Sequence, residues 1–149
     1  MTIYRLHQAI KERVERAVSE AGFQGLQVYI RNLPPLKYEG DAEKYFPHCV
    51  ITAGDGADAQ EESSMTAVLV LGTIDTVPEL RGYEEICHLV EILRLSFAEN
   101  PVLDGCFEVK LPVNFTPAEG EGDTYPHFFG SVWFDVQIPS PQRDYSDLT

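Results

Sequence analysis

Apolar residues recur at intervals of three and four positions in two stretches of the chain, which is the spacing of an amphipathic helix. The first stretch runs from Tyr4 to Ala21 and is followed by Gly22, a residue type that commonly ends helices. The second runs from Tyr83 to Glu99 and stops at Asn100-Pro101. Its apolar stripe consists of Ile86, Leu89, Val90, Leu93 and Phe97. The sequence therefore predicts two helices that each bury one face.

Other segments have the composition and alternation of strands. β-branched and aromatic residues predict short strands at Leu26 to Arg31, His48 to Ala53 and Cys106 to Leu111. A near-continuous apolar run from Met65 to Asp75 predicts a central strand that is buried on both faces. The segment from Phe128 to Ile138 predicts a last strand with two different faces. One face has Val132, Phe134, Val136 and Ile138, and the other has Ser131, Trp133, Asp135 and Gln137.

Polar segments rich in glycine or proline connect these elements. We expect a mobile acidic loop from Gly54 to Ser63 and a second loop from Pro112 to Pro126. Residues 139–149 are expected to form a polar C-terminal arm. No internal repeat or linker divides the chain, so we predict one α+β domain over residues 1–149, with a single mixed or antiparallel sheet packed against two amphipathic helices.

Charge and composition exclude several classes of protein. The chain has 149 residues, enough for one core, and its 24 acidic and 11 basic side chains give a net charge of −13. Such a field repels phosphate and disfavours sequence-specific nucleic-acid binding. Three cysteines without a C-x-x-C pair indicate a reducing cytosol rather than a disulfide framework or zinc knuckle. No stretch of 18 apolar residues and no signal-like N-terminus is present, so we expect no membrane association.

Candidate chemical groups are few. The neighbours His48-Cys49 and Cys87-His88 suggest metal binding, but adjacent side chains diverge on both strands and helices. We therefore expect no metal, no cofactor and no enzymatic activity. The sequence has no G-x-S-x-G elbow, although a small hydrolase assembled from distant residues stays an alternative.

The acidic loop is a second candidate. Its four carboxylates lack the spacing of an EF-hand, so we interpret them as solvated, with weak cation binding as the alternative. We also treat them as a candidate interface, because mobile loops often become ordered on docking. These residues are Asp55, Asp58, Glu61 and Glu62.

The second helix has apolar character away from its core stripe. At about 100° per residue, His88 and Leu95 point roughly opposite to Leu93, and Ile92 lies on their flank. Such side chains are either covered by another element of the chain or exposed to a neighbour. The second possibility makes His88, Ile92 and Leu95 candidate contact residues in an oligomer.

Five segments, in this order and spacing, resemble the tail-terminator or tail-completion proteins of long-tailed bacteriophages and prophages. They are FPHCVI at 46–51, VLVLGTID at 68–75, GY at 82–83, YPHFFG at 125–130 and VQIP at 136–139.

The resemblance implies a structural role. In that family a small subunit forms a hexameric ring that caps the tail tube, ends its polymerisation and joins the tail to the head connector. The implied partners are further copies of the chain, the tail tube protein and the head-tail connector. The implied location is the virion tail, or the host cytoplasm during assembly, and no catalysis or cofactor is implied.

An acidic module that mimics DNA is the competing function. Such a mimic would spread carboxylates along one face, whereas here much of the acidic charge lies in predicted loops. The polar side of the first helix also mixes both signs, as Glu12 and Arg16 illustrate. These features favour the structural role.

The charge generates a first prediction. Because each copy has a net charge of −13, self-association should strengthen when salt or divalent cations screen the repulsion. Light scattering across a range of ionic strength measures this. An average mass that falls with added salt would contradict it.

Overall fold

The computed structural model describes residues 2–37, 41–76, 80–119 and 124–148. In chain order its elements are α1 (Thr2–Glu20), β1 (Gln27–Ile30), η1 (Asp41–Tyr45), β2 (His48–Asp58), β3 (Ser63–Ile74), α2 (Gly82–Glu99), β4 (Val102–Leu103), β5 (Phe107–Thr116), β6 (His127–Ile138) and η2 (Ser146–Leu148), where η denotes a 3-10 helix.

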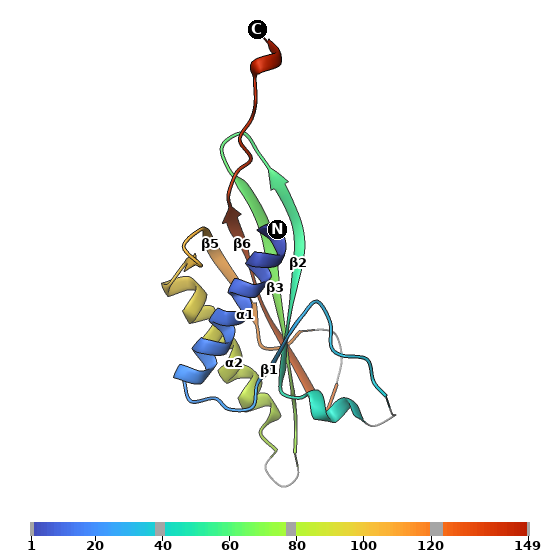
Figure 1. The fold of residues 1–149 in the computed structure, drawn as a ribbon. Helices are drawn as coiled ribbons and strands as arrows, with labels where there is room; N and C mark the ends of the chain where they lie inside the picture. Colours follow the sequence, from blue (N-terminus) through green and yellow to red (C-terminus); the bar gives the residue numbers. More distant parts are fainter. Residues whose placement is uncertain (1, 38–40, 77–79, 120–123, 149) are drawn as a thin grey trace.

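The strands form one mixed sheet that curls as a half-barrel. Their order is β1-β2-β3-β6-β5-β4; β1 and β2 are parallel and every other neighbouring pair is antiparallel. Both helices lie on the same face of the sheet, α1 over β1 and β2 and α2 across β3, β6 and β5 (Figure 1). The predicted α+β class, with one mixed sheet and two helices, is confirmed.

The core lies between the helices and this covered face. Ala67, Leu69 and Leu71 of β3 are buried there, and β6 supplies Phe134 and Val132 as the cross-strand partners of Ala67 and Leu69. All five residues of the predicted stripe on α2 are buried. On α1 the buried apolar residues are Leu6, Ile10, Val14 and Val18. The periodicity of the sequence thus identified the core faces of both helices and of β6.

The prediction that the third strand is buried on both faces was wrong. Alternate residues such as Val68 and Val70 point away from the helices and are only half-buried. Neither α1 nor α2 covers that side of the sheet (Figure 1). The 3-10 helix η1 lies at one end of it, where the ring of Tyr45 lies 6.3 Å from that of Tyr29. An apolar run shows that both faces of a strand are apolar. It does not show that another layer of the protein covers each face.

The acidic segment Gly54 to Ser63 is not the predicted loop. Most of it continues β2 and β3 as a long hairpin, in which Asp58 pairs with Ser63. The turn is closed by the bond from the Ala59 N–H to the Glu62 carbonyl, at 2.9 Å. β6 runs beside this hairpin up to Ile138. Its pairing with β3 stabilises the strand conformation of a segment whose composition resembles that of a loop.

The second predicted loop is also partly strand. β5 continues through Pro112 to Thr116, beyond the predicted end at Leu111. The pairing of β5 with β6 is irregular between Lys110 and Asn114, and β4 pairs only with Phe107 and Glu108. Pro112 therefore lies where β5 is an edge strand with an irregular ladder, a position that tolerates a missing N–H.

A buried cation joins the two helices. Arg13 of α1 is 7% exposed, and its guanidinium donates to the carbonyl oxygens of Asn100 at 2.6 Å, Val102 at 2.9 Å and Ser96 at 3.2 Å. These acceptors lie at and just beyond the C-terminal end of α2, where carbonyls lack intrahelical partners and the helix dipole favours a cation. The guanidinium also lies 5.8 Å from the ring centre of Phe97. Arg13 thus fixes α1 against the end of α2.

Replacing Arg13 should therefore destabilise the fold. We expect Arg13→Ala to lower the free energy of unfolding by about 2–4 kcal/mol, because three carbonyls lose a charged donor in a buried site. The exposed Arg16, one turn later on α1, provides the control: Arg16→Ala should change stability by less than about 0.5 kcal/mol. Urea unfolding followed by circular dichroism measures both, and equal losses in the two variants would contradict the prediction.

Candidate assembly surface

The face of the sheet that the helices leave uncovered has an apolar centre. Cross-strand pairing places Val50 beside Val70, and places Val68 between Thr52 and Trp133. All five side chains are half-buried. We call this group, Val50, Thr52, Val68, Val70 and Trp133, the second sheet face. Trp133 is the chain's one tryptophan and lies on β6 at the border of this group, opposite Val68 of β3.

Toward the hairpin the same side of the sheet becomes polar. Thr66 donates to a carboxylate oxygen of Asp135 at 2.7 Å, and Asp135 pairs across the ladder with Lys110. On the other side of Trp133 along β6, the Ser131 hydroxyl donates to Glu119 at 2.5 Å. The apolar centre is therefore bordered by polar groups, an arrangement common in protein interfaces.

An aromatic cluster closes the end of this side away from the hairpin. The ring of Phe46 lies 4.6 Å from that of His48, 5.0 Å from that of His127 and 6.2 Å from that of Phe129, between centroids. His48 is 3% exposed, and a Cβ added at Gly72 would lie 2.6 Å from its ring. Glycine at position 72 therefore provides the space in which the imidazole rests. Burial lowers the pKa of His48, and its Nδ1 has no partner within the described part of the chain.

The candidate metal pairs do not converge. His48 joins the aromatic cluster, while Cys49 points into the core on the opposite face, where burial raises the pKa of its thiol to about 12. On α2, Cys87 is half-buried and His88 is exposed. Within residues 2–37, 41–76, 80–119 and 124–148, no group of three or more His, Cys, Asp or Glu residues could hold a metal ion.

The four candidate carboxylates lie on the long hairpin. Asp58, Glu61 and Glu62 are at or beside its turn, and Asp55 lies in the irregular stretch of β2 between Ala53 and Gly56. All four are exposed. The hairpin projects past the ends of both helices (Figure 1). The structure therefore presents this acidic group on an ordered projection rather than on a loop.

The three candidates on α2 lie far from the hairpin and differ from one another. Ile92 is half-buried and packs against the core, so the structure covers it within the chain. Leu95 is also half-buried. His88 is exposed, and its ring lies 6.1 Å from that of Phe23, which follows α1. The structure therefore does not bring the helix candidates and the acidic candidates into one surface.

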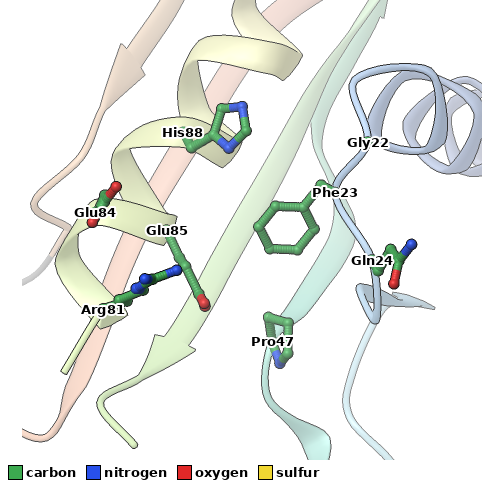
Figure 2. Close-up of a pocket in the computed structure, with 8 residues that line it drawn as sticks. All are labelled: Gly22, Phe23, Gln24, Pro47, Arg81, Glu84, Glu85 and His88. Carbon is green, nitrogen blue, oxygen red and sulfur yellow. The ribbon is translucent and has the colours of Figure 1, made fainter. Parts of the chain in front are cut away.

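His88 borders a hollow of about 380 Å³ between the end of α1 and the start of α2. Figure 2 shows Phe23 and Pro47 on one side and Arg81, Glu84 and Glu85 at the other, with His88 above them. The N–H of Gly82, at the start of α2, donates to Asp75 at 2.6 Å. The hollow is thus a groove between two helix ends, with charges of both signs on its wall.

Trp133 was not recognised as a candidate from the sequence, although a signal was present. It is a large aromatic residue in the polar half of the alternation in the last strand, between Ser131 and Asp135. A large apolar side chain in a polar register marks either a second layer or an exposed apolar site. The apolar run of the third strand concealed this, because we interpreted it as buried on both sides.

Comparison with known proteins adds information on the fold only. No family model matches the chain, and no curated protein sequence matches it. A comparison with solved structures finds 32 similar chains. One of them, whose name describes no function, has a TM-score of 0.57 and 12% sequence identity, over 96% of this chain and 99% of that one. In the part of the chain that the structure describes, neither helix combines the length and apolar character needed to span a membrane.

The buried imidazoles generate a prediction about pH. Burial lowers the pKa of His48 and of His7 below the ordinary value of 6.5. Protonation therefore favours the unfolded chain: the stability associated with the neutral rings is complete above about pH 6.5 and is lost as the pH falls through the folded-state pKa. Between about pH 7.5 and about pH 5.5, His48→Gln should lose less stability than the wild type.

Thermal unfolding at several pH values measures this difference. His88→Gln is the matched control, since His88 is exposed on α2. The interpretation is wrong if His48→Gln and the wild type lose the same stability over this range.

Proposed function

We propose that this chain is a structural subunit of a phage or prophage tail, which assembles into a ring at the end of the tail tube, ends tube polymerisation and joins the tail to the head connector. The observation that carries the proposal is the second sheet face. Val68, Val70 and Trp133 form an apolar centre on a side of the sheet that neither α1 nor α2 covers. Apolar surface with a polar border commonly marks a protein interaction site.

The segments that resemble tail terminators support a shared architecture, because several of them meet at one end of the sheet. The Asp75 N–H donates to the carbonyl of Pro126 at 2.8 Å, and the Asp75 carboxylate accepts the N–H of Gly82. A Cβ added at Gly82 would lie 2.7 Å from the ring of Phe128. The segments VLVLGTID, GY and YPHFFG are therefore parts of one packing arrangement.

The acidic charge is compatible with the role. A ring through which DNA passes benefits from a lumen that does not bind phosphate, and a net charge of −13 provides repulsion. The projecting hairpin, with Asp58, Glu61 and Glu62 at its turn, is the natural candidate to contact a neighbouring protein of the tail.

The same hairpin is the one observation that favours the competing function. Its exposed carboxylates could enter the basic groove of a DNA-binding protein as a DNA mimic. That function requires a monomer that binds such a protein in competition with DNA, whereas the structural role requires self-assembly.

Assembly on tube ends tests the proposal. Tail tube protein is polymerised with and without this chain, and the products are imaged by negative stain. We expect six-fold rings of the chain alone at high concentration, and shorter tubes with capped ends in the mixture. Val68→Asp, on the second sheet face, should stay folded and lose both activities, because it places a charge in an apolar contact.

Val102→Asp is the matched control, because Val102 is an exposed valine on β4, at the far edge of the sheet. It should assemble like the wild type. A wild-type chain that stays monomeric at all concentrations and leaves tube length unchanged would overturn the proposal. Copurification with a DNA-binding protein, reversed by DNA, would then favour the mimic.

A further inference from the structure

A second hollow, with a mainly apolar lining, lies at the free edge of β2. β1 pairs with β2 only from His48 to Ile51, and the last bond between them runs from the Arg31 N–H to the Ile51 carbonyl at 2.7 Å. Arg31 has a φ of 78°, so the chain turns away from the sheet there. From Thr52 onward, β2 has β3 on one side and no strand among the described residues on the other. Its outward N–H and C=O groups are open to a further segment.

The hollow has a volume of about 530 Å³ and is mainly apolar. Tyr4, Ile30 and Ile51 contribute apolar wall, and Ala53 lies on the free edge. We call it the edge hollow.

Among the described residues that line the edge hollow, Arg31 carries a positive charge and no carboxylate is present. His7 also lines it and can donate or accept a hydrogen bond. His7 Nε2 is buried and has no partner within the described part of the chain. In a protein with 24 acidic and 11 basic side chains, an apolar hollow lined by Arg31 and by no carboxylate is suited to an acidic segment with an apolar anchor.

The C-terminal arm is such a segment. After Ile138 the chain leaves the sheet and continues past the tip of the hairpin, away from the rest of the fold (Figure 1). Tyr145 is 53% exposed and Leu148 is 80% exposed, so neither is buried by its own chain. Asp144 and Asp147 flank Tyr145.

The tip of the arm is locally ordered. The Ser146 N–H donates to Asp144 at 2.9 Å, the guanidinium of Arg143 lies 5.3 Å from the ring centre of Tyr145, and residues Ser146–Leu148 form η2. Local order lowers the entropy that is lost on docking. The seven residues from 139 to 145, which precede η2, can span about 23 Å when extended, so Tyr145 can lie well away from the sheet of its own chain.

We propose that the C-terminal arm of one copy docks into the edge hollow of a second copy, with Tyr145 between Tyr4 and Ile30 and with Asp144 and Asp147 facing Arg31 and His7. This inference rests on the proposed function, because it names a contact between subunits of the ring. Arm and hollow are different surfaces, so the contact is heterologous, and repetition of it closes a ring where the rotation allows.

Sedimentation velocity on full-length variants tests the contact. Removing the anchors in Tyr145→Ala/Leu148→Ala should raise the dissociation constant of the assembly by about tenfold or more, as for buried aromatic residues in other interfaces. Arg31→Glu should have a similar effect. Arg31→Asp combined with Asp144→Arg should recover part of the loss, because the charge pair is restored in reverse. Lys37→Glu, the same change of charge at an exposed site outside the hollow, should assemble like the wild type.

A peptide of residues 139–149, labelled with fluorescein, tests the hollow directly. It should bind the Tyr145→Ala/Leu148→Ala protein, whose hollow is free, and should bind Arg31→Glu protein at least about tenfold more weakly. Binding that is equal in both proteins, or absent from both, would overturn the inference.

The outcomes separate this inference from the proposed function. Rings that form equally well with the arm variant would overturn arm docking and leave the ring function in place. If the peptide binds the hollow but the arm variant assembles like the wild type, the arm docks onto the hollow of its own chain. That result also overturns exchange between copies. If no variant and no wild-type protein assembles, the ring function fails, and the peptide titration still decides whether the hollow binds the arm.

Discussion

The structure depends on burial of apolar side chains between two helices and one face of a curved sheet. Leu69, Leu71, Val132 and Phe134 of the central strands meet Leu89, Leu93 and Phe97 of α2 there, and this burial provides most of the stability of a domain of this size. Both helices are used on the same face. The opposite face, which contains half-buried valines and a tryptophan, is covered by neither α1 nor α2.

Hydrogen bonds and close contacts at glycines fix the position of the helices on the sheet, which apolar burial alone does not determine. Arg13 joins α1 to the end of α2 through three carbonyls, so the helix layer has a defined arrangement on the sheet. At the other end, Gly72 leaves space for the His48 ring, and Gly82 allows α2 to begin against Asp75 and Phe128. Close packing at both ends keeps the sheet rigid, and a rigid surface loses less entropy when it docks.

The spacing and composition of the sequence were enough to locate most helices and strands, but they did not show which other elements contact each one. The spacing of apolar residues located both helices and the core face of β6. The strands predicted at Leu26 to Arg31 and Met65 to Asp75 match β1 and β3 closely, whereas β2 continues to Asp58, beyond the predicted end at Ala53. Composition failed where long-range pairing decides the structure. The acidic stretch near Asp58 is a strand because it pairs with β3, and the segment after Pro112 is a strand because it pairs with β6. Arg13 appeared as a polar residue of α1, because nothing nearby in sequence indicates that its acceptors lie more than eighty positions away. Three of the segments that resemble tail terminators, at 68–75, 82–83 and 125–130, lie in contact through Asp75, Gly82 and Phe128, and their distance along the sequence gave no sign of this contact.

The central claim is that the second sheet face is a contact surface, and the chain contains a probe for it. Trp133 is the one tryptophan and lies in that face, so its fluorescence reports on that face alone. Emission spectra and acrylamide quenching are recorded from dilute to concentrated protein, with sedimentation at the same concentrations. The account predicts a blue shift and reduced quenching that follow the appearance of the assembled species. Assembly without any change in the emission or quenching of Trp133 would contradict it.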